Sequence, residues 1–217
     1  MALDALLFDL DGTLLETEEG ILACFRQTFE ALGLPQKPDL ELRRYIGPPL
    51  QAAWNELVGA ERAEEAIALY RDCYEAFGKL RARPYDGIPE ALAQLSTTHR
   101  LFVATSKRHP FALEMVEHFG LARYFSGVYG LRPEKLDEDK TALIARVLRD
   151  QRLSPRQAVM IGDRKYDLIG AQANRVGAVG VLWGYGSQAE LEAHHPMALC
   201  RWPHDLPGLI AKMPPRA

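Results

Sequence analysis

The chain has 217 residues, of which 47% are hydrophobic and 25% charged, and its formal net charge is −3 at pH 7. This length and composition are typical of a globular protein with one large domain, or of a core domain that carries an insert. The balanced charge lacks the basic footprint of a nucleic-acid-binding protein, and no apolar run approaches the roughly 20 residues of a membrane span. We therefore expect neither a nucleic-acid polymer nor a membrane as a partner.

The N-terminal residues and the cysteines predict a cytoplasmic location. Met1–Asp4 has no basic region ahead of an apolar one, so a secretory signal is not expected. Cys24, Cys73 and Cys200 are odd in number, far apart and without metal-type spacing. Reduced thiols are the expectation for such a set in the cytoplasm.

Two carboxylates follow the first predicted strand. The apolar run Leu3–Phe8 is followed directly by Asp9 and Asp11, and then by Gly12 and Thr13. Alternating side chains place both carboxylates on one side, where their repulsion requires a cation or a shared proton. A nucleophilic carboxylate, an acid/base carboxylate and a hard divalent cation are what phosphoryl transfer through an aspartyl-phosphate needs. The structural alternative is a strand-to-turn junction, where Asp and Gly are common.

The region from Leu15 to about Arg83 is expected to be a helical insert. Apolar residues recur there at helical spacing, and the expected helices cover residues 21–32, 39–46, 50–58 and 66–77. No strand is expected in this region. The insert therefore covers residues 15–83 and separates residues 1–14 from residues 84–217.

The remainder of the chain alternates between strand and helix. Short apolar strands are expected at 101–104, 158–161 and 180–183, with one helix beginning near Pro110 and another covering 139–149. Apolar runs without alternation, separated by helices, indicate a parallel sheet that is buried on both faces. The predicted fold class is α/β, with the ligand site beyond the carboxyl ends of the strands.

Hydroxyl side chains follow the strand at 101–104. Thr105 and Ser106 come where this strand ends, and their hydroxyls with free backbone N–H groups would form a phosphate cradle. Helix capping is the structural alternative. Lys107 comes next, and it is either part of the site or solvated.

A lysine and two more aspartates complete the candidate site. Lys140 opens the helix at 139–149, where a cation is unfavourable by roughly 0.3–1 kcal/mol. It is either a solvated lysine balanced by neighbouring acids or a partner of the nucleophile and the incoming phosphate. Asp163 ends the strand at 158–161, and Asp167 lies about one turn further on. These carboxylates either cap a strand-to-helix turn or help to hold magnesium, which prefers oxygen ligands.

Four elements in this order resemble the haloacid dehalogenase superfamily of aspartate-nucleophile hydrolases. They are Asp9-Leu10-Asp11-Gly12-Thr13, Thr105-Ser106, Lys140, and Gly162-Asp163 followed by Asp167. The resemblance covers essentially the whole chain and is closest to the phosphoglycolate-phosphatase-like branch, whose members are labelled phosphoglycolate phosphatases or nucleotidases. It implies a Rossmann-like core at 1–14 and 84–217, a helical cap at 15–83, and Mg²⁺ as cofactor.

The resemblance also implies a role for each matching residue. Asp9 is the expected nucleophile, and Asp11 is the acid that protonates the leaving alcohol and the base that deprotonates water. Thr105 and Ser106 would bind the transferring phosphoryl group, and Lys140 would offset charge on it and on Asp9. The expected metal-binding residues are Asp9, Asp11 (through its backbone carbonyl), Asp163 and Asp167 (through water or from outside direct coordination). The predicted activity is a magnesium-dependent phosphatase acting on a small phosphorylated metabolite, either phosphoglycolate-like or a nucleoside monophosphate.

Two other functions stay open on the same residues. A phosphomutase shares each of them and differs in passing the phosphoryl group to a phosphorylated sugar instead of to water. A non-catalytic binding protein on the same scaffold is the other alternative, whereas dehalogenation is disfavoured because Asp11 has no role in it. The expected assembly is a monomer or a homodimer.

Substrate specificity is expected to come from the helical insert. The candidate substrate-binding residues there are Arg43, Arg44 and Gly47, in a helix end and the Gly-Pro-Pro loop that follows it. An arginine can bind a substrate carboxylate through two hydrogen bonds, and a solvated surface arginine is the structural alternative. Trp183 and Tyr185 either wall the pocket or pack in the core.

Overall fold

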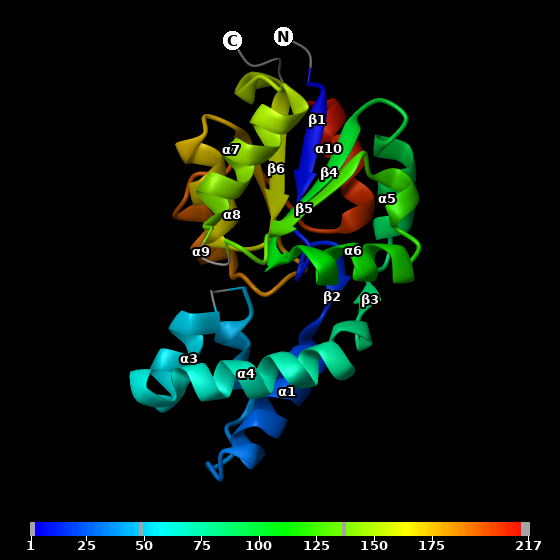
Figure 1. Cartoon of the computed structure of the whole chain (residues 1–217). Helices are drawn as coiled ribbons and strands as arrows, with labels where there is room; N and C mark the ends of the chain where they lie inside the picture. Colours follow the sequence, from blue (N-terminus) through cyan, green and yellow to red (C-terminus); the bar gives the residue numbers. More distant parts are fainter. Residues whose placement is uncertain (1–2, 48–49, 136–137, 214–217) are drawn as a thin grey trace. The chain divides into compact units, whose positions relative to one another are not determined.

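The computed structural model describes residues 3–47, 50–135 and 138–213, and it divides into two compact units (Figure 1). The core unit comprises the chain up to Leu15 and from Pro84 onward, and the cap unit comprises Glu16–Arg83. The sequence prediction places this division between residues 14 and 15 and between residues 83 and 84.

The core unit contains a six-stranded parallel sheet in the order β5-β4-β1-β6-β7-β8. The strands are β1 (Ala5–Phe8), β4 (Arg100–Arg108), β5 (Gly127–Leu131), β6 (Ala158–Gly162), β7 (Gly177–Val181) and β8 (Ala198–Cys200). Every residue of β1 and β6 is buried, because both faces of the sheet are covered. This explains the unbroken apolar runs in the sequence, and the predicted α/β class with a Rossmann-like core is confirmed.

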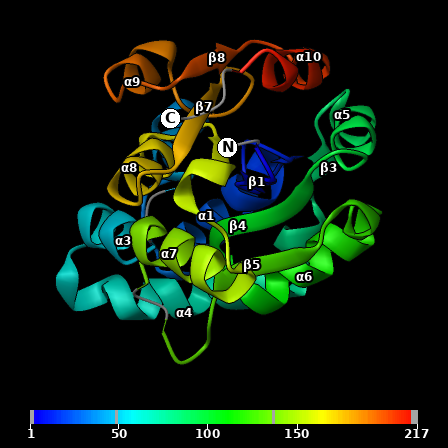
Figure 2. The same cartoon turned by 90° about the horizontal axis from the view of Figure 1, so that it is seen from above.

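Helices cover both faces of this sheet. They are α5 (Ile88–Leu95), α6 (His109–His118), α7 (Lys140–Gln151), α8 (Lys165–Ala173), α9 (Gln188–Glu192) and α10 (Leu206–Ala211). Figure 2 shows α7 and α8 on one side of the strands and α5, α6 and α10 on the other. The α7 helix begins where the Asp139 side chain accepts the Ala142 N–H at 2.7 Å, and it ends at Arg152, whose φ of 53° is left-handed.

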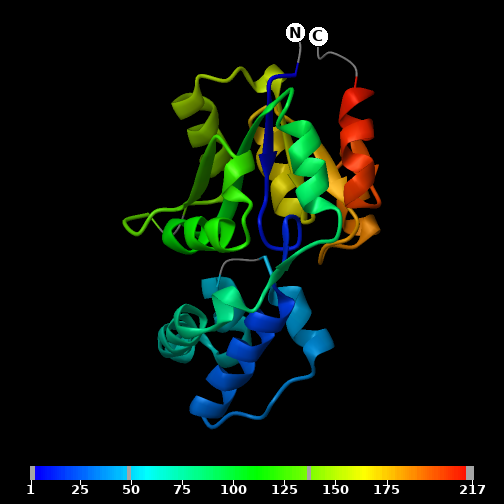
Figure 3. The same ribbon diagram turned by 90° about the vertical axis from the view of Figure 1, so that its right-hand side faces the viewer.

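The cap unit is built from helices (Figure 3), and aromatic side chains lie at its centre. They are α1 (Glu18–Ala31), α2 (Asp39–Leu42), α3 (Leu50–Val58) and α4 (Ala60–Ala76), with short 3₁₀ turns at Arg43–Tyr45 and Gly78–Leu80. The fully buried Trp54 lies 4.9 Å from Phe25 and 5.6 Å from Phe29, measured between ring centroids. The predicted helical cap is confirmed. None of the described helices is both long and apolar enough to cross a membrane.

Several strands differ from the sequence prediction. Two-residue strands β2 (Leu15–Glu16) and β3 (Arg83–Pro84) pair where the chain passes between the units, so the expectation of no strand in 15–83 is wrong at both ends. The predicted strand at 180–183 lies three residues too late, since β7 covers Gly177–Val181. Strands β5 and β8 were not predicted, because β5 contains two glycines, which weaken a strand pattern, and β8 has only three residues.

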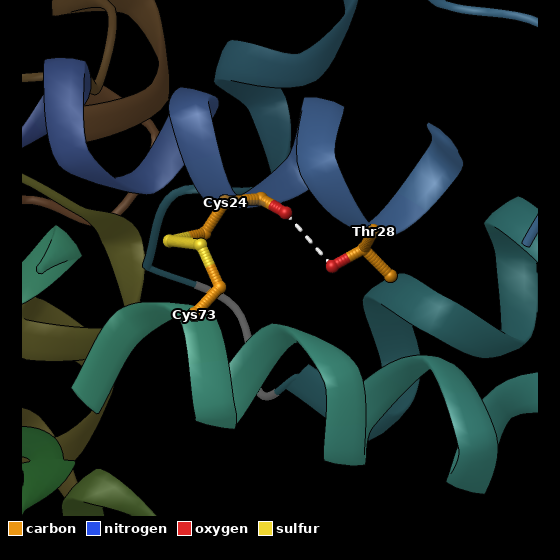
Figure 4. The surroundings of a disulfide bond; sticks show 3 residues. All are labelled: Cys24, Thr28 and Cys73. Atoms are coloured by element: carbon orange, nitrogen blue, oxygen red, sulfur yellow. Dashed lines mark hydrogen bonds between the residues drawn. A yellow bond between two sulfur atoms is a disulfide. The ribbon is translucent and has the colours of Figure 1, made fainter. Parts of the chain in front are cut away.

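A disulfide bond joins two helices of the cap unit (Figure 4). Cys24 on α1 and Cys73 on α4 are both buried, and their Cα atoms lie 5.6 Å apart, within the range that a disulfide spans. One turn along α1, the Thr28 hydroxyl donates to the Cys24 carbonyl oxygen at 2.8 Å. The expectation of reduced thiols is therefore wrong for this pair. Cys200 is a free and buried thiol, and burial raises its pKa to about 11.

Candidate active site

Three adjacent strands bring the candidate residues to one edge of the sheet. Phe8, the last residue of β1, pairs with Val103 of β4 on one side and with Ile161 of β6 on the other. Asp9, Thr105 and Asp163 come just after these paired positions, so the topology gathers them at the carboxyl end of the sheet. This is where parallel α/β sheets hold their ligands.

Three carboxylates form a close acidic cluster at this edge. One carboxylate oxygen from each of Asp9, Asp163 and Asp167 lies within 4.8 Å of the others. Asp163 and Asp167 are almost completely buried, and Asp9 is 9% exposed. Ionised carboxylates this close to one another and out of water are costly unless cations offset their charge.

Asp163 has the most strongly perturbed carboxyl group in the cluster. Burial, together with the charges of Asp9 and Asp167, raises its pKa to about 8. Two donors act in the opposite direction. The Thr13 hydroxyl donates to Oδ1 at 3.1 Å, and the Tyr185 backbone N–H donates to Oδ2 at 2.8 Å.

Glycines allow the surrounding loops to approach Asp163. Gly12 has a φ of 82°, which side chains rarely adopt, and a Cβ there would collide with the Asp163 carboxylate. A Cβ at Gly184 would collide with the same side chain, and one at Gly186 with the Asp163 backbone. The Asp-Leu-Asp-Gly turn and the Gly-Tyr-Gly segment at 184–186 therefore pack directly against Asp163.

Lys140 supplies the cation at the centre of the cluster. Its Nζ donates to Asp9 Oδ1 at 2.8 Å and to the Ala104 carbonyl oxygen at 2.9 Å, and it pairs with Asp167 Oδ1 at 2.8 Å. Burial alone would lower the Lys140 pKa, but the carboxylates of Asp167 and Asp9 outweigh it and raise the pKa. The solvated-lysine alternative is therefore wrong, since the Lys140 side chain is only 6% exposed.

Asp167 combines a place in the cluster with a structural contact. Its Oδ2 accepts the Arg164 backbone N–H at 3.1 Å at the start of α8. Burial raises its pKa to about 6, and the Lys140 charge limits the rise. The sequence leaves helix capping and metal binding as alternatives for this residue. In the structure Asp167 both caps α8 and lies in the acidic cluster.

Asp11 lies apart from the three-carboxylate cluster and has its own lysine. Its Oδ2 is 3.1 Å from Lys107 Nζ, and the Lys107 side chain is only 8% exposed. Thr105, which is buried, accepts the Lys107 backbone N–H on its hydroxyl oxygen at 3.2 Å, so its own proton is available for a phosphoryl oxygen. Ser106 follows it on β4 and is half-buried.

The two candidate arginines of the cap unit pair with carboxylates of the same unit. Arg43 Nε lies 2.6 Å from Glu18 Oε1, and Arg44 pairs with Glu56. Gly47 has a φ of 103°. Pro48 and Pro49 of the predicted loop lie outside the described residues.

Three contacts of this site are not predicted by the sequence pattern. Tyr185 contacts Asp163 through its backbone N–H and not through its ring. Trp183 donates its indole N–H to the Thr13 carbonyl oxygen at 3.0 Å. Lys107 was not assigned to Asp11. A signal for the first was present in the two glycines at 184 and 186, which indicate close backbone approach.

The donors present fit a hard divalent cation. Magnesium is bound through one or two carboxylates together with substrate phosphate and water, and the cluster offers three carboxylates. Burial raises the Asp163 pKa most, and bound Mg²⁺ would relieve the carboxylate repulsion that adds to this effect. The residues that would hold it are Asp9 and Asp163, with Asp167 beside them.

The fold and this site define an α/β enzyme with an aspartate cluster at the sheet edge, and sequence comparison assigns the family. The family model of haloacid dehalogenase-like hydrolases matches residues 6–181, so the chain belongs to this family. The resemblance inferred from the four sequence elements is confirmed. The predicted enzyme class, a phosphoric monoester hydrolase, is confirmed with it.

Similar proteins have several recorded activities. The chain is 41% identical over 199 residues to a 5′-nucleotidase of Pseudomonas aeruginosa, covering 90% of each protein. It is 39% identical over 182 residues to the tyrosine-protein kinase PtkA of Mycobacterium tuberculosis, covering 83% of this chain and 62% of that protein. The solved structure of a haloacid dehalogenase-like hydrolase from Streptococcus pneumoniae matches with a TM-score of 0.92 and 32% identity, over 95% of this chain and 98% of that one.

Proposed function

We propose that this protein is a magnesium-dependent phosphatase that passes the phosphoryl group of a small metabolite first to Asp9 and then to water. The observation that carries the proposal is Lys140, whose Nζ lies 2.8 Å from both Asp9 Oδ1 and Asp167 Oδ1. A carboxylate held by a buried cation, beside donors for a divalent metal, suits attack on phosphorus.

In the first step, an Asp9 oxygen forms a bond to phosphorus while the bond from phosphorus to the leaving oxygen breaks. The proton of the Asp11 carboxyl group moves to the leaving oxygen, which departs as an alcohol. The Thr105 hydroxyl donates to a phosphoryl oxygen, and Lys140 keeps a positive charge beside Asp9. When bound, Mg²⁺ would supply charge neutralisation for the phosphoryl oxygens.

In the second step, water attacks the phosphorus of the phospho-Asp9. Asp11, now a carboxylate, accepts a proton from this water as the new bond from oxygen to phosphorus forms. The bond between phosphorus and the Asp9 oxygen breaks, which releases inorganic phosphate and restores the Asp9 carboxylate. Asp11 is protonated again and ready for the next cycle.

The proposed substrates are phosphoglycolate-like compounds and nucleoside monophosphates. The similarity to a 5′-nucleotidase supports the second group, and the phosphoglycolate-phosphatase-like pattern of motifs supports the first. A panel of phosphorylated metabolites with purified protein and Mg²⁺, measured as phosphate release, ranks them by kcat/KM. Release without any bisphosphate activator distinguishes a hydrolase from a phosphomutase. ATP with a tyrosine-containing peptide belongs in the same panel, because one relative is named a tyrosine-protein kinase.

The proposed nucleophile is tested by Asp9→Asn. We expect no turnover and no labelled protein, whereas wild-type protein quenched rapidly with labelled substrate carries phosphate on Asp9. Asp150→Asn is the matched control, since Asp150 lies exposed at the far end of α7, and it should keep full activity. Substantial activity in Asp9→Asn, or label on another residue, would overturn the assignment.

Magnesium dependence has a readout apart from activity. A ligand that binds only the folded state raises the midpoint of thermal unfolding. Mg²⁺ added to metal-free wild-type protein should raise this midpoint, and it should do so far less in Asp163→Asn. Equal shifts in the two proteins would place the metal elsewhere.

A further inference from the structure

Lys107 occupies a position at the site that the motifs do not account for. Its Nζ lies 3.1 Å from Asp11 Oδ2, and the two side chains are only 8% and 16% exposed. A nearly buried lysine whose charge faces a nearly buried carboxylate is uncommon on a protein surface, where lysine heads remain in water. Contact with solvent therefore does not explain why the Lys107 side chain lies beside Asp11.

The two lysines of the site serve different carboxylates. Lys140 directs its Nζ to Asp9, Asp167 and the Ala104 carbonyl oxygen, which accounts for the three donors of an ammonium group. Asp11 receives its ion pair from Lys107. Each of the two carboxylates with a proposed chemical step is thus held by a separate cation.

The backbone of β4 is built to hold Lys107 in place. The pairing of β4 with β5 is irregular here, because Ala104 pairs with Tyr129 but Arg108 pairs with Leu131. Four positions along β4 therefore correspond to only two along β5. Such irregularities re-aim side chains and are enriched beside active sites. The Lys107 N–H donates to the Thr105 hydroxyl oxygen at 3.2 Å, which ties this segment to a residue that is itself buried.

A glycine on the neighbouring strand makes room for this segment. A Cβ at Gly130 of β5 would lie 2.6 Å from the Lys107 carbonyl oxygen and 2.7 Å from the His109 Cα, which is closer than real Cβ atoms come. Any larger residue at 130 would push the Lys107 backbone away. The position of Lys107 therefore depends on three places in the sequence and is not an accident of one side-chain rotamer.

The two oxygens of Asp11 have different surroundings. Oδ2 faces Lys107, whereas Oδ1 is buried and has no hydrogen-bond partner among the described residues. An ammonium group that holds one oxygen fixes the plane of the carboxylate, because rotation would break the contact. The ion pair with Lys107 therefore holds the Asp11 carboxylate in one orientation.

We propose that Lys107 is the positioning residue for Asp11, holding its carboxylate in the orientation in which it gives a proton to the leaving group and takes one from water. This inference rests on the proposed phosphatase function. Lys107 acts through Asp11 and does not touch the phosphoryl group. Its removal should therefore impair proton transfer and spare the bond that Asp9 forms to phosphorus.

The test is Lys107→Met, which keeps most of the side-chain length and removes the charge. Because kcat/KM reports steps up to the phosphorylated enzyme, it should fall for an alkyl phosphate, whose leaving oxygen needs a proton. We expect about a 10²-fold fall, at the low end of general-acid effects, and less than about a threefold fall for 4-nitrophenyl phosphate, whose leaving group needs no proton. Lys107→Arg should recover part of the loss. The control Lys212→Met, exposed just after α10, should leave both values unchanged.

A double variant separates this role from a general loss of charge. If Lys107 acts through Asp11, then Lys107→Met should cost nothing further in an Asp11→Asn background. Equal losses for the two substrates, or losses that add in the double variant, would overturn the inference.

A structural measurement decides the inference independently of activity. In a crystal structure of Lys107→Met, the Asp11 carboxylate should leave its wild-type orientation, and in Lys212→Met it should keep it. An unmoved Asp11 in Lys107→Met overturns the inference even where the variant is inactive. A wild-type protein that releases phosphate from no monoester would instead contradict the proposed function.

Discussion

The core unit and the cap unit use charged residues in opposite ways. In the core unit the side chain of Lys140 is 6% exposed, and it pairs with the side chains of Asp9 and Asp167, which are 12% and 2% exposed. In the cap unit Arg26 and Asp39 pair while each is about half exposed, at 47% and 50%. Burying charge costs more than exposed pairing returns, so stability does not explain the core cluster.

The cap unit gains its stability from other sources. Its centre is aromatic, with Phe25, Phe29, Trp54 and Tyr70 in contact, and a disulfide joins α1 to α4. A change of charge should therefore have a large effect in the buried cluster of the core unit and a small one at the exposed pairs of the cap unit. The following predictions test that contrast, beginning with the largest effect.

Removing the central cation should have the largest effect. Lys140→Met leaves Asp9 and Asp167 buried without their partner, so we expect kcat/KM to fall by about 10²–10³-fold or more. The free energy of unfolding should fall by about 3–5 kcal/mol, as for other buried pairs that lose one member. Added Mg²⁺ should return part of this stability but little of the activity. Lys212→Met is the control, and wild-type turnover in Lys140→Met would contradict a catalytic cluster.

Reducing the disulfide should have the next largest effect. It should lower the free energy of unfolding and leave kcat/KM unchanged. The bond closes a loop with a sequence separation of 49, for which loop-closure entropy gives about 4 kcal/mol at most. We expect the oxidised protein to unfold at a higher denaturant concentration than the reduced one. Cys24→Ala/Cys73→Ala is the control, since reductant should not change its midpoint. A reductant effect of equal size in this variant would mean that the bond contributes nothing.

The raised Asp163 pKa predicts how the stability of the metal-free protein depends on pH. The pKa is about 8 in the folded protein and close to the ordinary value of 3.8 when unfolded. Between these values the folded state holds a proton that the unfolded chain has lost, so this group's contribution to stability falls as pH rises. We therefore compare the midpoint of thermal unfolding of wild type with that of Asp163→Asn. The difference, wild type minus variant, should fall as the pH rises from about 5 to about 8. A difference that is flat or rising with pH would show that the Asp163 pKa is not raised.

The sequence predicted those parts of the molecule that depend on local pattern. Asp9, Lys140 and Asp163 are candidate site residues in the sequence because each follows a strand or opens a helix, and the structure brings the three together. The Lys107 contact with Asp11 depends on an irregularity in β4 and on a glycine in β5, a strand that the sequence did not predict. Local periodicity does not report such contacts between strands.

The disulfide shows the same limit over a longer distance. Cys24 and Cys73 are 49 positions apart, and only the packing of α1 against α4 brings them together. Their number and spacing favoured free thiols, because counting cysteines carries no information on helix packing. The strand at 180–183 was displaced for a related reason, since the bulky residues after β7 resembled a strand more than its glycines did.

The smallest effect is expected from the exposed arginines of the cap unit. Arg43 pairs with Glu18 while its own side chain is 54% exposed, so this contact is weak and can be exchanged for a substrate carboxylate. Arg43→Ala should then lower kcat/KM for a carboxylate-bearing substrate by about tenfold, the value of one charged hydrogen bond. Hydrolysis of 4-nitrophenyl phosphate should be unchanged, because this substrate has no carboxylate to bind. Arg44→Ala makes the same test at the neighbouring position. The matched control is Arg26→Ala, which removes an arginine of similar exposure that pairs with Asp39 in the same unit. Equal losses for the two substrates would count against a specificity role, and no loss for either would leave both arginines without a role in substrate binding.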